Sequence, residues 1–271
     1  MPGRAPRVLR TEALVLRHRR LGEADRIVTL LTPRHGKRDA VAKGALRTRS
    51  RLAGHLEPLA HVEVVLAHGR TLDVVTQAES QQLFPSVHGD LDRLAAALYL
   101  LELTDRLTVD HAEADAIFVL LATALDRLER GDGLHLVSRS FELALLEATG
   151  FRPEWERCVS CGEPVAERDG AGTAAWSALA GGVLCNRHAA ADPEAGPIEV
   201  RLLRVLRAYQ RGPYEEAARI RLDPELAARL EQVMHALARA TAERDLGTAR
   251  FVAAVRARAG EPDDVEIRDR D

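Results

Sequence analysis

The chain has 271 residues, of which 46% are hydrophobic, 29% charged and 4% aromatic, with a formal net charge of −3. This composition is sufficient for a buried core and excludes an intrinsically disordered chain. No apolar run approaches the roughly 18 residues of a membrane span, and no apolar signal segment follows Met1, so we expect a cytoplasmic protein that makes no membrane contact.

The first third of the chain has the pattern of β-structure. Short β-branched or alternating runs are separated by turn residues such as those at 33–37 and 68–70. They predict five strands at 11–18, 26–32, 39–43, 61–67 and 72–77. The number and length of these strands fit a five-stranded barrel of the oligonucleotide/oligosaccharide-binding (OB) type within residues 1–82. An SH3-like barrel fits the same pattern nearly as well.

From Asp90 onward, leucine and alanine recur at helical spacing. Helices are expected in the ranges 91–107, 115–129, 134–149, 198–210, 223–243 and 247–258. They form an antiparallel helical bundle in two parts, residues 83–152 and 193–259. Residues 153–192 lose this periodicity and are predicted to be a small ribbon-like module that interrupts the bundle. The charged residues 260–271 are predicted to be a disordered tail, so the fold class is α+β.

The three cysteines provide the strongest chemical signal. Cys158 and Cys161 form a C-x2-C pair, and Cys185 and His188 form a C-x2-H pair after 23 intervening residues. Two such pairs supply four ligands, enough to close a tetrahedral structural zinc site with one ion per chain. Three unrelated cytosolic cysteines are the simpler alternative. His188 is the weakest of the four ligands, and a water molecule in its place would leave the metal open for catalysis.

A second motif in the sequence would be consistent with a catalytic metal. His61 and Glu63 form an H-x-E motif which, together with the C-x-x-C pair, is similar to the zinc deaminase signature. However, Arg157 stands where that signature has proline, and His61 and Glu63 fall on a strand of the predicted barrel. The sequence also has no P-loop, G-x-S-x-G or H-E-x-x-H motif. We therefore expect a protein that is not an enzyme.

Charge is distributed unevenly along the chain. Residues 1–82 contain 15 basic and 8 acidic groups, whereas residues 83–150 contain 5 basic and 12 acidic groups. A basic module joined to an acidic one indicates two kinds of partner, one of them polyanionic. The basic side chains at strand ends and connections are the candidate DNA-binding residues. They are Arg17, Arg19, Arg20, Arg34, Lys37, Arg38, Lys43, Arg47, Arg49 and Arg51.

Residues 1–83 contain no Phe, Tyr or Trp. An OB barrel that holds single strands usually stacks the bases on aromatic side chains. Such stacking is not available here. We therefore expect binding that acts mainly through the phosphate backbone, with little sequence selectivity and a steep dependence on salt.

An ordered set of segments gives the chain a resemblance to a known family. Residues 12–17, 21–26, 28–32, 36–38, 41–45 and 56–59 resemble the N-terminal domain of the bacterial RecO recombination mediators, and the likeness continues through residues 100–103, 141–146, 158–162 and 181–185. It covers most of the chain, from about residue 11 to about residue 250. His188 stands where the family usually has a fourth cysteine. Residues 246–251 depart from the family's usual C-terminal segment.

The resemblance implies a non-enzymatic DNA-repair protein. Members of the RecO family bind single- and double-stranded DNA through the OB domain and anneal complementary strands. They partner RecR, act with RecF, help to load RecA onto strands coated by single-stranded DNA-binding protein (SSB), and contact the acidic C-terminal tail of SSB. A zinc-ribbon RNA-binding or regulatory module without annealing activity remains the alternative that composition equally allows.

Overall fold

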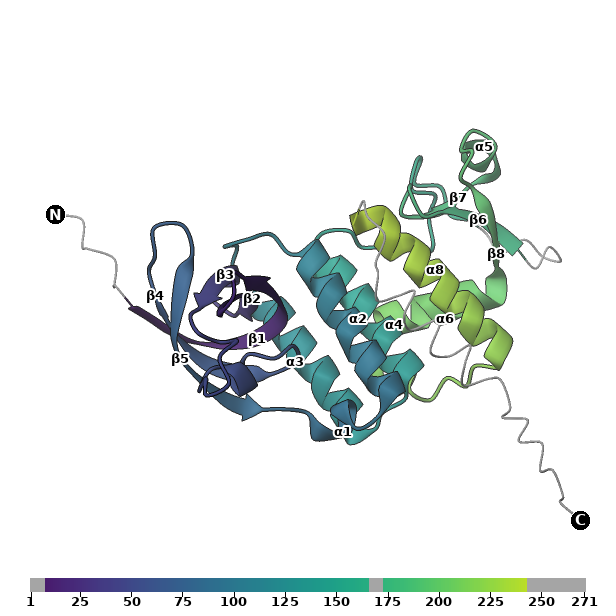
Figure 1. Ribbon diagram of the computed structural model, residues 1–271. Coiled ribbons are helices and arrows are strands. Elements are labelled where there is room, and N and C mark those ends of the chain that lie inside the picture. Colours follow the sequence, from purple (N-terminus) through teal and green to yellow (C-terminus); the bar gives the residue numbers. More distant parts are fainter. Residues whose placement is uncertain (1–7, 166–172, 243–271) are drawn as a thin grey trace, which may run out of the picture.

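The computed structural model describes residues 8–165 and 173–242. A β-barrel lies at one end, helices occupy the centre, and a small module lies beyond them (Figure 1). The helix expected at 247–258 and the tail expected at 260–271 fall outside the described residues.

The barrel is built from five strands and is closed in the order β1-β2-β3-β5-β4. The strands are β1 (Val8–Leu21), β2 (Asp25–Thr32), β3 (Gly36–Ala42), β4 (His61–Ala67) and β5 (Asp73–Gln82). All neighbouring strands are antiparallel except β3 and β5, which pair in parallel. This Greek-key order is that of the OB fold, so the OB prediction is confirmed over the SH3-like alternative. Alternation along β4 turns Val62, Val64 and Leu66 into the barrel interior.

The five longer helices follow the predicted ranges closely, whereas the short helices α1 (Pro85–His88) and α7 (Tyr214–Ala217) were not predicted. The longer helices are α2 (Leu91–Leu107), α3 (Asp115–Arg130), α4 (Leu134–Ala148), α6 (Val200–Arg211) and α8 (Pro224–Ala242). The Asp90 carboxylate caps α2 by accepting the backbone N–H groups of Asp92 and Arg93. Gly131 ends α3 in the left-handed conformation. Within the described part of the chain, no helix combines the length and the apolar character needed to cross a membrane.

The module has more regular structure than the sequence indicated. Strands β6 (Thr173–Ser177), β7 (Gly182–Leu184) and β8 (Gly196–Glu199) form a three-stranded sheet in the order β7-β6-β8, and α5 (Asn186–Ala189) follows β7. Trp155 packs against Trp176 with ring centroids 6.5 Å apart. These strands are short and rich in Gly and Ala, so neither β-branched residues nor alternation made them visible in the sequence.

Two hydrophobic cores hold these parts together. One lies inside the barrel and includes Val28 and Val64. The other is continuous from Leu31 on the barrel, through the helices, to Trp155 in the module and Ile198 on β8. The barrel and the module are therefore both packed on the helices rather than linked to them by a flexible tether.

The turn between β2 and β3 packs tightly against the connection between α2 and α3. Ala114 donates its backbone N–H to the Pro33 carbonyl at 2.9 Å, and His111 donates to the Lys37 carbonyl at 3.0 Å. Gly36 has a φ of 64°, and a Cβ atom built on it would lie 1.9 Å from the carbonyl oxygen of Ala112. Only glycine therefore allows the two backbones to approach this closely.

A buried polar cluster ties three helices of the bundle together. The Arg139 guanidinium on α4 lies 2.9 Å from the Glu142 carboxylate, which also accepts a hydrogen bond of 2.6 Å from the Tyr99 hydroxyl on α2. Arg139 further donates to the Glu231 carbonyl on α8. Burial and the charge of Glu142 raise the pKa of Tyr99. Tyr99 therefore remains a hydrogen-bond donor and helps to hold the ionised pair in the core.

Replacing Gly36 by alanine tests the barrel–helix contact. Gly36→Ala should lower the free energy of unfolding by about 3 kcal/mol or more, because the methyl group combines left-handed strain with a clash against Ala112. Gly22→Ala is the matched control, since Gly22 has a φ of 63° but no atom near its Cβ position. That control should cost about 1 kcal/mol. Equal losses in chemical denaturation would show that the close approach at Gly36 is unimportant.

Candidate metal centre and nucleic-acid interface

The four metal ligands predicted from sequence meet at one point. Cys158 and Cys161 lie in a turn between the bridged residues Arg157 and Pro164, Cys185 comes directly after β7, and His188 lies on α5. Their ligand atoms all lie within 4.8 Å of one another. The structure therefore brings the C-x2-C and C-x2-H pairs together as the spacing predicted.

The distances within the cluster fit one tetrahedral ion. The Sγ atoms of Cys161 and Cys185 lie 3.9 Å apart, and the Cys158 Sγ lies 3.5 Å from the His188 Nδ1. Metal–sulfur bonds of about 2.3 Å and metal–nitrogen bonds of about 2.0 Å, opened to the tetrahedral angle, require about 3.8 Å and 3.6 Å respectively. The four side chains can therefore hold a metal ion and saturate its coordination.

The backbone prepares Cys158 for this role. Burial by itself raises the pKa of its thiol, but hydrogen bonds from the backbone N–H groups of Cys185, Ser160 and Cys161 outweigh burial and lower the pKa to about 6. The turn that supplies the Ser160 and Cys161 donors is closed by the Gly162 N–H, which donates to the Cys158 carbonyl at 2.8 Å, whereas Cys185 follows β7. At neutral pH the side chain is a thiolate, the form that binds metal.

The catalytic alternative does not assemble. His61 and Glu63 lie on β4 in the barrel, where His61 lies near Glu12 and Glu63 pairs with Arg10. The cysteine cluster lies in the module on the other side of the helices (Figure 1). The H-x-E motif and the C-x-x-C pair therefore do not share a site.

Removing one exposed ligand tests the metal centre. Cys161→Ser takes away a thiolate from an exposed position, so it leaves no cavity in the core. Purified wild-type protein should hold about one metal ion per chain, and the variant only a small fraction of that amount, with local unfolding around residues 153–192. Ser160→Ala, at the neighbouring exposed position, should keep the metal. Elemental analysis that finds a full equivalent on the Cys161 variant would contradict the assignment.

Three of the predicted DNA-binding residues are already paired within the protein. The Lys37 ammonium lies 3.3 Å from the Asp105 carboxylate and 3.4 Å from that of Asp110, with only 12% of its side chain exposed. Arg17 also pairs with Asp105, at 2.7 Å. Arg38 pairs with Asp73 at 2.8 Å. Lys37 and Arg17 therefore neutralise acidic groups at the barrel–helix contact, a role that their prediction as DNA-binding residues did not include.

Six of the remaining residues are exposed and lie on the β1–β2 hairpin or on the connection after β3. The connection after β3 lies beside the β1–β2 turn, because Gly44 N–H donates to the Asp25 carboxylate at 2.7 Å and Leu46 N–H donates to the Ala24 carbonyl at 2.9 Å. This brings the two basic stretches together at an exposed edge, which we call the basic rim. It consists of Arg19, Arg20, Lys43, Arg47, Arg49 and Arg51.

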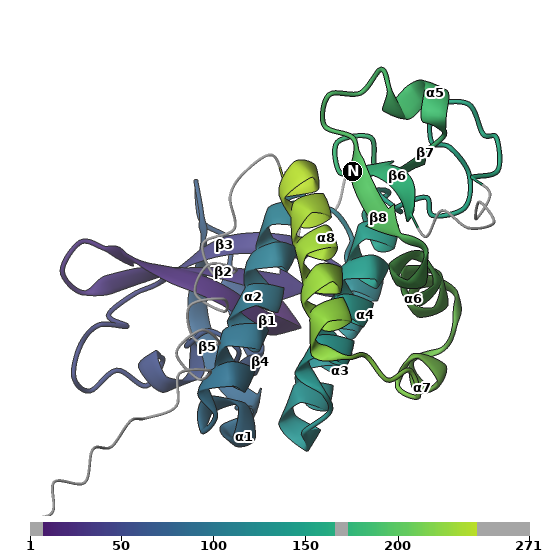
Figure 2. The same ribbon diagram turned by 90° about the vertical axis from the view of Figure 1, so that its right-hand side faces the viewer.

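The basic rim is open to solvent. Arg19 lies 3.8 Å from Asp39, a loose pair, while no ion pair involves the other five side chains within the described residues. The β1–β2 hairpin extends away from the helices (Figure 2). Arg34 is also exposed, but it lies in the β2–β3 turn beside the helices and is not part of the rim. A phosphate backbone can therefore approach the rim without meeting the acidic helices.

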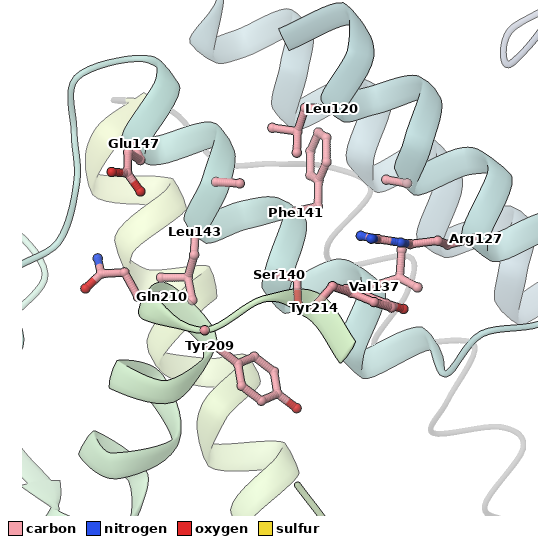
Figure 3. Close-up of a pocket in the computed structure, with 13 residues that line it drawn as sticks. Leu120, Arg127, Val137, Ser140, Phe141, Leu143, Glu147, Tyr209, Gln210 and Tyr214 are labelled. Carbon is pink, nitrogen blue, oxygen red and sulfur yellow. The ribbon is translucent and has the colours of Figure 1, made fainter. Parts of the chain in front are cut away.

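A pocket between α3, α4 and α6 was not anticipated from the sequence. It has a volume of about 210 Å³, and Leu120 and Phe141 form part of its apolar wall (Figure 3). The Arg127 guanidinium stacks 3.4 Å from the centroid of the Tyr214 ring, and the Tyr214 hydroxyl donates to Asp132 at 2.9 Å. Arg127 and Tyr214 lie far apart in the sequence, so no local pattern could have revealed this site.

Comparison with known proteins assigns both halves of the chain. Residues 7–84 match the model of the recombination protein O N-terminal domain, and residues 88–250 match that of its C-terminal domain. The chain is 39% identical to the DNA repair protein RecO of Roseiflexus sp. (strain RS-1) over 92% of its length and 87% of the relative's. It is 40% identical to the Heliobacterium modesticaldum RecO over 88% of its length and 86% of the relative's. It is 34% identical to the Symbiobacterium thermophilum RecO over 90% of its length and 96% of the relative's.

Proposed function

The chain belongs to the RecO family of DNA repair proteins, and from that premise we propose that it binds DNA at the basic rim and anneals complementary strands. The observation that supports this most directly is that exposed cations from two separate segments, five of them without an ion pair in the described part of the chain, lie at one edge of an OB barrel. Cations at this edge neutralise the phosphates of a bound strand and lower the repulsion that opposes its pairing with a second strand. Annealing by this route needs no catalytic group, so we propose that the protein is not an enzyme.

We assign zinc to the Cys3His cluster. Three thiolates and one imidazole at tetrahedral spacing suit Zn²⁺, and a site with four protein ligands has no open position for a substrate. When bound, zinc supplies structural cross-linking of the module. Cys158 and Cys161 would hold it from the turn between Arg157 and Pro164, and Cys185 and His188 from β7 and α5.

The family membership supports partners in the same pathway. We propose that the protein works in the cytoplasm with RecR and RecF, and helps to load RecA onto SSB-coated single strands. A zinc-ribbon module that binds RNA or regulates another protein remains the second candidate. Annealing of complementary single-stranded DNA that structured RNA does not inhibit would favour the first function over the second.

A charge-removal variant tests the basic rim. Arg20→Ala/Lys43→Ala/Arg49→Ala removes three exposed cations that pair with no carboxylate in the described part of the chain. It should weaken binding to all DNA sequences by at least about tenfold and lower the slope of log affinity against log salt by about 2 to 3. Arg93→Ala/Arg106→Ala/Arg130→Ala, the same loss of charge from the helices, is the control. Equal losses from the two variants would remove the rim as the DNA site.

We assign the acidic tail of SSB to the pocket between α3, α4 and α6. Arg127 supplies a cation at the pocket, and Leu120 and Phe141 supply an apolar wall, a combination that suits a peptide with both acidic and apolar side chains. Arg127→Ala should weaken binding of a synthetic SSB-tail peptide by about tenfold. Arg130→Ala, on the last turn of the same helix, should leave it unchanged. Calorimetry that shows no difference between the variants would contradict this assignment.

A further inference from the structure

A second cluster of arginines lies where the module joins the helices. A cavity of about 330 Å³ separates the last turns of α6 from the segment at residues 152–157. Four arginines line it, against two glutamates. The arginines are Arg152, Arg157, Arg207 and Arg211. This excess of positive charge is local, because residues 151–271 as a whole contain 18 basic and 21 acidic groups. We call this cavity the arginine pocket.

The wall of the arginine pocket is held from both sides. Arg207 on α6 donates from Nε and Nη2 to the Trp155 carbonyl at 3.0 and 2.8 Å, and Gln210 donates to the Pro153 carbonyl at 2.9 Å. On the other side, Glu154 donates its backbone N–H to the Gly181 carbonyl and accepts from the Val183 N–H. Segment 152–157 is thus fixed between α6 and β7, and the pocket is preorganised.

The two arginines at the edge of the arginine pocket form exposed ion pairs within the protein. Arg152 pairs with Glu147 at 3.1 Å, and Arg211 pairs with Glu156. More than half of each arginine side chain is exposed, at 53% and 59% respectively. Solvent screening makes such exposed ion pairs weak, so a phosphate group can replace either carboxylate at small cost. Guanidinium groups are suited to this exchange because they bind phosphate oxygens in a bidentate manner.

The basic groups continue beyond the pocket along α6. Arg201, Arg204, Arg207 and Arg211 follow one another at intervals of three or four residues and therefore lie on one side of the helix. Ten residues of helix separate the first from the last, a distance of about 15 Å. A row of this length exceeds what one isolated phosphate occupies and suits a polymer with regularly spaced phosphates.

We propose that the arginine pocket and the adjoining side of α6 bind the phosphate backbone of a second DNA strand. This inference rests on the proposed annealing function and adds a second site to it. The barrel and α6 lie on opposite sides of the central helices in both ribbon views (Figures 1 and 2). One chain can therefore hold one strand at the basic rim and another at the arginine pocket.

The test measures how many short strands one full-length chain binds. The probe is a fluorescein-labelled oligothymidylate of about 12 nucleotides, which fits within a single OB-fold site. Wild-type protein should bind two of these strands. Arg152→Ala/Arg211→Ala should bind one and anneal complementary strands about tenfold more slowly, because each lost arginine removes a phosphate contact. Both side chains are largely exposed, so thermal unfolding of the variant should match that of the wild type.

Two further variants sharpen the result. Arg93→Ala/Arg106→Ala removes two partly exposed, ion-paired arginines from α2 and should still bind two strands. Glu156→Gln removes the carboxylate that competes for Arg211 and should tighten the second site about threefold, a gain expected only if an anion takes that place.

The outcomes separate this inference from the proposed function. If Arg152→Ala/Arg211→Ala still binds two strands and anneals normally, the second site is wrong while binding at the rim stands. In another case the wild-type protein binds only one strand. If Arg152→Ala/Arg211→Ala abolishes that binding while Arg20→Ala/Lys43→Ala/Arg49→Ala retains it, the arginine pocket is supported as a DNA site and the basic rim is wrong. If wild-type protein binds no strand, both fail. If the pocket binds an acidic peptide but no second oligothymidylate, the assignment to DNA is overturned.

Discussion

The contact between the β2–β3 turn and the helices is the constraint on which the rest of the architecture depends. At Gly36 the barrel backbone meets that of Ala112 at a distance no other residue permits, and the adjacent Lys37 places its ammonium between Asp105 and Asp110. Because one end of the barrel is closed off in this way, its other end faces solvent. The β1–β2 hairpin and the connection after β3 meet at that free end and form the basic rim.

The same contact shows that the uneven distribution of charge along the chain also serves to hold the barrel on the helices. The basic segment 1–82 and the acidic segment 83–150 are in part each other's partner, since Arg17 and Lys37 both pair with Asp105. Within the described residues, most of the exposed cations of the barrel that no carboxylate pairs with lie on the β1–β2 hairpin and the connection after β3. A polyanion is therefore attracted to the rim and repelled by the acidic segment 83–150. The absence of aromatic residues from this segment leaves phosphate contact as the main source of affinity.

The metal centre and the arginine pocket are joined through the backbone. Arg157 lines the pocket and Cys158, the next residue, belongs to the Cys3His cluster. In a small module, metal-binding energy is also folding energy. An ion held by this cluster would therefore also order one wall of the pocket, while α6 orders the other through Arg207 and Gln210. The continuous core from Leu31 to Ile198 then keeps the rim and the pocket in a defined relation.

Local patterns in the chain were sufficient for the five strands of the barrel, for the five longer helices α2, α3, α4, α6 and α8, and for the four residues of the Cys3His cluster. Each of these depends on residues close in sequence: alternation in β4, leucine spacing in α2, and paired knuckles around Cys158 and Cys185. The short strands of the module escaped detection because they lack those patterns. Which cations are open to solvent was decided only by the tertiary structure. Lys37 and Lys43 are both lysines and are six positions apart, yet Lys37 lies between Asp105 on α2 and Asp110 in the following loop, whereas Lys43 is exposed. An ion pair between distant segments forms only when packing brings those segments together, so no local sequence pattern predicts it.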